Sequence, residues 1–145
     1  MSVGGQIGTT CPCGTGDSLD RCCGPFLSMQ AEPRTAAALM RARYSAHALG
    51  NTAYLVRSWH PDTCPPVVTD SSYHWTGLEV RDRERGRALD RDGTVCFVAH
   101  WEREGERGQL AERSRFVRLG TRWVYVDGDA LPGPGFARLG MRDCS

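Results

Sequence analysis

The chain has no lysine, no long apolar run and no excess of either charge. All 18 basic residues are arginine, and 17 acidic residues leave a formal net charge of +1. This balance provides no electrostatic driving force for binding nucleic acid or an anionic bilayer. No apolar stretch approaches the roughly 18 residues that a membrane-spanning helix needs, so we expect no membrane insertion.

Motifs for common catalytic chemistry are also missing. The chain has no internal repeat and no glycine-rich phosphate loop, and no serine or cysteine stands in a recognisable base-plus-orienter setting. The sequence therefore leaves open whether the protein is an enzyme and favours a non-catalytic role. With 145 residues and 40% hydrophobic content, it predicts one globular domain with a small appendage.

The most informative stretch is a cysteine cluster near the N-terminus. Four of the seven cysteines fall within thirteen residues, at positions 11, 13, 22 and 23. Zinc prefers four thiolate or imidazole ligands in a tetrahedron, and the proline and glycines between these cysteines favour a chain that turns back on itself. The segment is too short to bury a core, so we expect a bound metal to order it.

Two simpler interpretations of the cluster are a disulfide pair and unpaired thiols. Adjacent cysteines rarely bond to each other, because the resulting ring is strained. No secretory signal is visible, which argues against an oxidising compartment. The spacing therefore favours a Zn²⁺ site and a cytoplasmic location.

Two helices are expected after the cluster. Thr35 is a suitable N-cap for a helix that ends near Gly50, and Asn51 is suitable for a second helix over 52–59. In the first helix, Arg41 and Arg43 lie off the apolar stripe, although one of them could line a cavity.

Four strands are expected after the helices, at 75–80, 94–101, 110–119 and 123–127. Two helices followed by an antiparallel meander predict an α+β domain, with the helices packed on one face of a curved sheet. Along 94–101, the pattern puts Val95, Phe97 and Ala99 on one face and Cys96 and Val98 on the other.

The cysteine stretch resembles a known motif. Cys-Pro-Cys-Gly-x-Gly followed by Cys-Cys-Gly is similar to the SEC-C motif, a zinc module also found at the C-terminus of the translocase ATPase SecA. The resemblance implies that the metal ligands are Cys11, Cys13, Cys22 and Cys23. SecA-type versions often carry histidine at the last position, where this chain has cysteine.

The rest of the chain resembles the YchJ family. The motifs are Leu39-Met40-Arg41-x-Arg43-Tyr44-Ser45-Ala46, Tyr54-Leu55, Trp59-His60-Pro61, Glu112-Arg113-Ser114-Arg115-Phe116 and Trp123-x-Tyr125-x-Asp127-Gly128. That family joins SEC-C to a cone-shaped, cystatin-like domain similar to nuclear transport factor two. The resemblance implies a zinc module at 8–30, a cone at 31–130 and an irregular tail at 131–145.

A cone of this kind encloses a pocket between the helices and the concave sheet face. The candidates for its lining are Tyr44, Trp59, Trp75, His100, Arg113, Arg115, Trp123 and Tyr125. Most of the aromatic residues are expected to be core. A buried Arg113 or Arg115 would either pair with Asp127 or hold an anionic ligand.

Three residues are candidates for acid, base or anion-holding roles: His60, Glu112 and Asp127. The plainer interpretation of His60 is a histidine at a helix end that bonds the backbone, since the sequence supplies no base partner for it. His60 and Cys64 have metal-like spacing, but two ligands do not make a site.

Two functional hypotheses follow. The first is a zinc-binding interaction or accessory protein, whose SEC-C module docks a protein partner while the cone is a scaffold or homodimerisation unit. The alternative is a cone pocket that binds a small molecule or catalyses an isomerase-like or dehydratase-like reaction. The balanced charge argues against nucleic acid as a partner.

Overall fold

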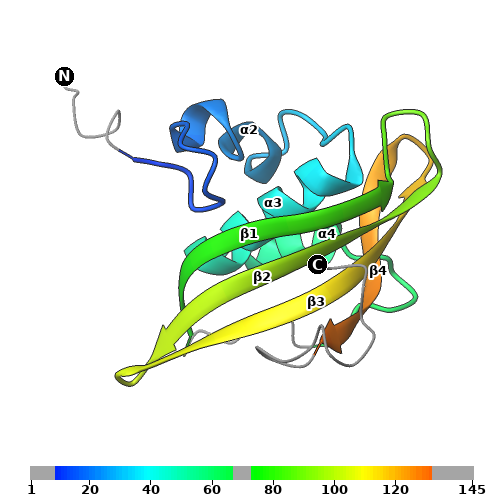
Figure 1. Cartoon of the computed structure of the whole chain (residues 1–145). Coiled ribbons are helices and arrows are strands. Elements are labelled where there is room, and N and C mark those ends of the chain that lie inside the picture. The colour runs from blue at the N-terminus through cyan, green and yellow to red at the C-terminus, as the bar shows by residue number, and fades with distance from the viewer. Residues whose placement is uncertain (1–8, 67–72, 132–145) are drawn as a thin grey trace.

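The computed structural model describes residues 9–66 and 73–131. A small N-terminal unit with η1 (Leu19–Arg21) and α2 (Gly24–Leu27) precedes the helices α3 (Ala36–Leu49) and α4 (Thr52–Arg57). The strands are β1 (His74–Arg85), β2 (Asp92–Arg103), β3 (Glu106–Leu119) and β4 (Arg122–Leu131). The helices lie on one side of a curved sheet (Figure 1), which confirms the predicted α+β architecture.

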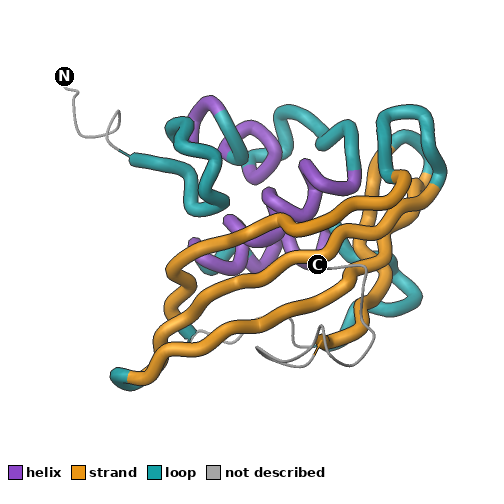
Figure 2. Tube along the Cα trace, viewed as in Figure 1, coloured by secondary structure: helices purple, strands orange, loops and turns teal. Residues whose placement is uncertain are grey.

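The sheet is an antiparallel meander in the order β1-β2-β3-β4. The strands are longer than the sequence indicated, and Figure 2 shows them running on into the hairpins. β1 continues to Arg85 because backbone pairing with β2 extends through its polar half, where apolar patterning gives no signal. β3 begins at Glu106, ahead of the predicted start at 110: Gly108 pairs with Trp101 inside the β2–β3 ladder, and the turn lies at Glu104–Gly105.

The caps of α3 form as predicted. Thr35 Oγ1 accepts a hydrogen bond from the Ala38 N–H at 3.0 Å, and Gly50 ends the helix with φ of 73°. Asn51 likewise caps α4, through a bond from the Tyr54 N–H.

The second helix ends earlier than predicted, at Arg57 rather than Trp59. Beyond the helix the backbone turns to β4, because Tyr125 N–H donates to Ser58 O at 2.8 Å and His60 N–H donates to Tyr125 O at 2.7 Å. A local helical pattern does not reveal this pairing, since its partner lies more than sixty residues away.

The main core lies between α3 and the concave face of the sheet. It includes the buried side chains of Leu39, Leu55, Val95, Phe97, Phe116 and Trp123. On the other sheet face, Cys96 and Val98 pack in a second cluster with Ala111 and Leu131. The predicted alternation along β2 is therefore confirmed.

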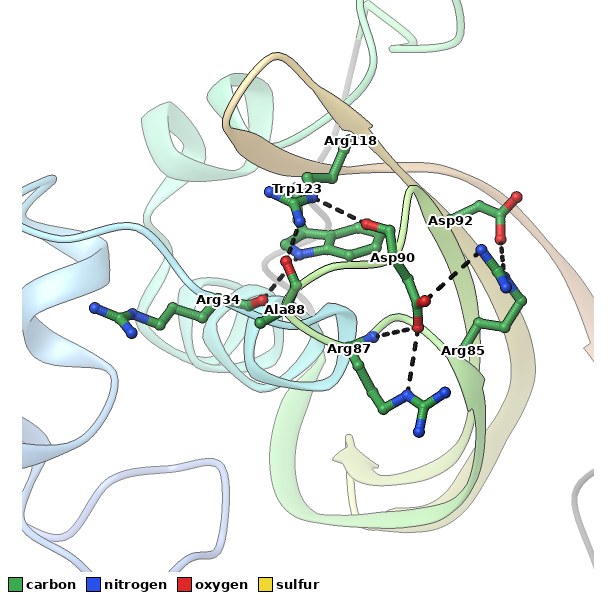
Figure 3. Close-up of polar contacts among 8 residues, drawn as sticks. All are labelled: Arg34, Arg85, Arg87, Ala88, Asp90, Asp92, Arg118 and Trp123. Atoms are coloured by element: carbon green, nitrogen blue, oxygen red, sulfur yellow. Dashed lines mark hydrogen bonds and ion pairs between the residues drawn. The ribbon is translucent and has the colours of Figure 1, made fainter.

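One corner fastens the β1–β2 turn to β4 and to the start of α3 (Figure 3). The Arg118 guanidinium stacks over the Trp123 ring and donates to the carbonyls of Asp90 and Ala88. Trp123 Nε1 donates to Arg34 O at 3.1 Å. These contacts join the start of α3, the β1–β2 turn, β3 and β4, so they hold the β1–β2 turn and the start of α3 against the end of the β3–β4 hairpin.

Every helix in the described part is too short or too polar to cross a membrane. The predicted tail at 131–145 lies outside the described residues, except for Leu131, which ends β4. The domain boundaries at 8–30 and 31–130 stay predictions.

Candidate functional site

The four clustered cysteines come together in space. Their sulfur atoms all lie within 4.8 Å of one another, and both Cys11–Cys13 and Cys13–Cys22 have Sγ–Sγ distances of 3.5 Å. A tetrahedral site with Zn–S bonds of about 2.3 Å places its sulfurs about 3.8 Å apart. The spacing of the four sulfurs therefore matches tetrahedral coordination of a single metal ion. No other group of three or more ligand-type residues gathers within residues 9–66 and 73–131.

A tight turn followed by two short helices brings these sulfurs together. Gly14 and Gly16 adopt φ of 90° and 91°, values that favour glycine, and Thr10 pairs with Ser18 across the turn. Cys22 ends η1 and Cys23 precedes α2, so the second pair of thiols faces the turn. The local chemistry predicted for this stretch therefore produces a convergent cluster.

Burial limits how much charge the thiols can carry on their own. Cys11, Cys13 and Cys23 are at most 2% exposed. The Cys23 thiol, by hydrogen bonding, lowers the pKa of Cys13 to about 4, while burial raises the pKa of Cys22 to about 11. The pKa of Cys23 is raised by its bond to Cys13 and by burial. Full deprotonation of such a cluster needs a cation at its centre.

The cysteine segment is attached to α3. Cys11 Sγ lies 3.4 Å from Ser45 Oγ, and Arg41 Nη1 donates to Cys13 O at 2.9 Å. Cys11, Cys13 and Cys23 belong to the same buried cluster as the cone's core residues. The module is therefore packed onto the cone and does not hang from a free linker.

A cavity of about 240 Å³ lies between the helices and the concave sheet face. Its aromatic walls are Tyr44, Trp59, Trp75, Phe97, Phe116 and Tyr125. Its polar lining is Arg43, His47, Glu112 and Ser114. Of the predicted pocket residues, the lining contains Tyr44, Trp59, Trp75 and Tyr125. It also contains Glu112 and Ser114 of β3.

Among the described residues, Arg43 is the only arginine in this lining, and it is 6% exposed. Its Nη1 donates to Leu55 O at 3.0 Å and to Ser58 Oγ at 2.7 Å. The guanidinium carbon lies 4.7 Å from the centre of the Trp59 ring and 4.5 Å from that of Tyr125. Burial lowers the pKa of Arg43 to about 10, so the side chain remains a cation at neutral pH.

Glu112 lines the same cavity as this cation. Tyr125 OH donates to Glu112 Oε2 at 2.7 Å, and burial followed by the Glu112 charge raises the pKa of Tyr125. An added Cβ at Gly128 would lie 1.7 Å from Glu112 Oε2, so only glycine leaves room for this carboxylate. Tyr125 thus touches Arg43 with its ring and Glu112 with its hydroxyl.

The other pocket candidates lie outside the lining. His100 points to the outer side of the sheet, with Nε2 2.6 Å from Glu79 Oε2. Trp123 is a buried core residue, and its contacts with Arg34 and Arg118 are drawn in Figure 3. Arg113 and Arg115 alternate with Glu112 and Ser114, so the strand pleat turns them away from the cavity.

The pairing predicted for Arg115 is present, but it is not buried. Arg115 Nε donates to Asp127 Oδ1 at 2.6 Å, Nη1 donates to Asp129 Oδ2 at 2.8 Å, and all three side chains are well exposed. Asp127 is thus occupied by a surface ion pair. His60 also lies outside the lining, and its Nδ1 accepts a bond from the Asp62 N–H at 3.0 Å.

Sequence reasoning did not name His47 or Met40 as cavity residues, and it named Arg43 only as one of two arginines that could line a cavity. A signal was available, because Met40, Arg43, Tyr44 and His47 follow the i, i+3, i+4, i+7 spacing of one helix face. The apolar pattern put Arg41 and Arg43 off the stripe and left open which of them could line a cavity. In His47, burial and the nearby Arg43 lower the pKa to about 4, so this histidine is neutral at neutral pH.

Comparisons with known proteins agree with this architecture. The family description "YchJ, middle NTF2-like domain" matches residues 35–128. A UPF0225 protein of Streptomyces coelicolor is 46% identical over 122 residues, covering 83% of this chain and 95% of the relative. A UPF0225 protein of Ralstonia nicotianae is 45% identical over 132 residues, covering 82% and 90%.

Two solved structures share the fold. A SEC-C motif containing protein from Rhodopseudomonas palustris has a TM-score of 0.75 at 31% identity, covering 84% of this chain and 98% of that one. A SEC-C motif containing protein from Psychrobacter arcticus has a TM-score of 0.67 at 26% identity, covering 84% and 82%. The chain therefore belongs to the YchJ-like UPF0225 family, in which a SEC-C motif precedes a nuclear-transport-factor-2-like domain.

Proposed function

We propose that this protein is a cytoplasmic zinc-binding accessory factor, and that its SEC-C module contacts a protein partner. The observation that carries the proposal is the convergence of four thiols within 4.8 Å. An all-sulfur tetrahedral set favours Zn²⁺ over hard cations such as Mg²⁺ or Ca²⁺. Cys11, Cys13, Cys22 and Cys23 would be the ligands.

A four-cysteine site is closed, which assigns the metal a structural role. Catalytic zinc keeps a position open for water or substrate, whereas four protein thiolates fill the coordination sphere. The ion would hold the turn against η1 and α2, and the supporting contacts from Ser45 and Arg41 would hold the module on α3. The chemistry of this centre therefore supports binding and not metal catalysis.

The outward side of the module offers an apolar contact point. Met29 follows α2, is 46% exposed and has φ of 66°. Exposed methionines suit adaptable protein contacts, because the unbranched thioether side chain conforms to different surfaces. We assign the partner-facing surface to this end of the module.

Elemental analysis and a binding assay test the proposal together. Native protein should carry one zinc per chain, Cys22→Ser should carry much less, and the control Cys64→Ser should be unchanged. In a pull-down with this protein as bait, Met29→Asp should no longer recover the protein partner, although this variant keeps the four cysteine ligands of the metal. Absence of stoichiometric zinc would overturn the metal assignment, and unchanged partner recovery with Met29→Asp would overturn the docking surface.

A second candidate function, small-molecule binding in the cone, is favoured by the cavity beside Arg43. A buried guanidinium is costly unless it is paired, and within the described residues Arg43 has no carboxylate partner. Of the three residues predicted for acid or base roles, Glu112 alone lines this space. Crystal density or NMR shifts confined to the cavity lining would support this function, whereas no shift with any small-molecule library would oppose it.

A further inference from the structure

We propose that the cone cavity takes a small monocarboxylate with a flat apolar body, and that Arg43 recognises its carboxylate. This inference rests on the second candidate function, small-molecule binding in the cone. It does not depend on the role assigned to the cysteine module.

The Arg43 guanidinium is a buried cation, and residues 9–66 and 73–131 leave some of its hydrogen-bond donors unused. A guanidinium has five N–H donors, and within the described residues both hydrogen bonds of Arg43 use Nη1 and end on neutral oxygens. In the described part of the chain, neither Nε nor Nη2 has a hydrogen-bond partner. Those two nitrogens form the edge that binds a carboxylate through two parallel bonds.

The surrounding residues hold the Arg43 guanidinium in one orientation. The Trp59 and Tyr125 rings lie 4.7 and 4.5 Å from the guanidinium carbon, and Ser58 and the Leu55 carbonyl hold one end. The cation is therefore already oriented before a ligand arrives, so little side-chain entropy is lost on binding. Trp59 Nε1 is also buried and has no hydrogen-bond partner among the described residues, so it is a further donor on a ring that packs against the cation.

The charges in the cavity lining limit the charge that a ligand can carry. Glu112 lies in the same lining, and its charge acts on Arg43. Its Oε2 already accepts from Tyr125, and the hydrogen bonds of Arg43 to described residues go to Leu55 O and Ser58 Oγ, not to this carboxylate. Because this carboxylate repels a second negative charge, the cavity favours a monoanion over a phosphate dianion. His47 is neutral at neutral pH and supplies no second cation.

The volume of the cavity and the side chains that line it limit the size and shape of the ligand. A cavity of about 240 Å³ has the volume of roughly eight water molecules in the liquid. Its walls are mainly aromatic and aliphatic side chains, which suit an aryl group. A benzoate-sized to naphthoate-sized acid matches both the volume and the single cationic anchor.

The experiment uses full-length, zinc-loaded protein and matched pairs of probes. Benzoate, 2-naphthoate and 4-phenylbutyrate are each compared with their neutral primary amides and with 1-naphthyl phosphate, by NMR titration of tryptophan indole N–H signals. We expect at least one acid to bind at least about tenfold more tightly than its amide, and to shift the Trp59 signal. The phosphate should bind more weakly than 2-naphthoate.

Two variants separate recognition from folding. Arg43→Gln should remove the preference for acid over amide, and Arg43→Lys should retain part of it because the charge stays while the two-bond edge is lost. Arg41→Gln, on the same helix but bonded to the cysteine module, is the control and should keep the preference. If Arg43→Gln fails to fold, the comparison of acid with amide in the wild type still decides.

Each failure has its own signature. Equal binding of acids and amides would overturn carboxylate recognition while leaving small-molecule binding in place. No binding by any probe at millimolar concentration would overturn both. An acid that shifts the Trp101 or Trp123 indole signal but neither that of Trp59 nor that of Trp75 would place the site outside the cavity and overturn the role of Arg43.

Discussion

The cysteine module and the cone form their buried interiors by different chemistry. Neither η1 nor α2 contains a buried residue, and the buried groups of the module are its sulfurs. The cone instead buries large side chains such as Leu39, Phe116 and Trp123. The difference shows that one region depends on coordination and the other on apolar area, so separate perturbations should act on them separately.

Metal removal should produce the largest separation between the two regions. With a strong chelator, or in Cys13→Ser, amide exchange over residues 11–22 should accelerate by more than about a hundredfold, since zinc sites contribute about 10–16 kcal/mol in small modules. Amides in β2 and β3 should keep their protection. Hydrogen-exchange mass spectrometry measures both. Unchanged protection of the turn without metal would show that packing alone orders it.

A cavity in the core should have the opposite effect. Leu39 is 1% exposed, and Leu39→Ala should lower the free energy of unfolding by about 2–5 kcal/mol while the folded protein still binds zinc. Urea denaturation followed by far-UV circular dichroism measures the loss. Leu89→Ala is the control, because Leu89 is 94% exposed and its truncation should change little. Zinc loss from folded Leu39→Ala would contradict the separation.

Acidification should weaken the cone through His47. Burial, followed by the charge of Arg43, lowers its pKa from 6.5 to about 4. Between these values the unfolded chain binds a proton that the folded chain does not, so stability falls as the pH falls from about 6.5 to 4. The loss should be about 1–3 kcal/mol.

The test compares His47→Gln with wild type across that pH range at saturating zinc. Protonation of the thiolates is common to both proteins, so it cancels in the difference. The difference in stability should change across the window and be constant above pH 7. A difference independent of pH would remove His47 as the titrating group.

Loosening the contact between the regions should have the smallest effect. Arg41→Gln removes the bond to Cys13 O and should cost about 1 kcal/mol, seen as severalfold faster exchange in the module with zinc retained. Arg107→Gln is the matched control, since Arg107 is 84% exposed on the β2–β3 hairpin. Equal exchange in both variants would mean that this bond does not hold the module on α3.

Local chemistry made much of the fold predictable. Thr35, Gly50 and Asn51 mark helix ends by side-chain capping and backbone conformation, which depend on neighbouring residues alone. The alternation along β2 is also local and assigned both sheet faces. The spacing of the cysteines was equally informative, because the ligand types and the turn residues stand in one short stretch.

Features that depend on distant residues were not predictable. The sequence left open which of Arg41 and Arg43 turns inward, because the two aromatic faces that hold the Arg43 guanidinium come from the distant Trp59 and Tyr125. The early end of α4 depends on the bridge from Trp59 to Tyr125. For Arg115, the strand pattern predicted the partner Asp127 but did not fix which face of the sheet is outward.

The meander also sets an order for synthesis on the ribosome. The first long helix, α3, contacts β1, β2 and β4, and the backbone at its start bonds to Gly86 and to the Trp123 ring nitrogen. A nascent chain therefore emerges with the apolar side of α3 uncovered, and each successive hairpin covers more of it. Only when the last strand leaves the exit tunnel is that side closed, so translation arrest before Trp123 would release a chain open to chaperones and proteases.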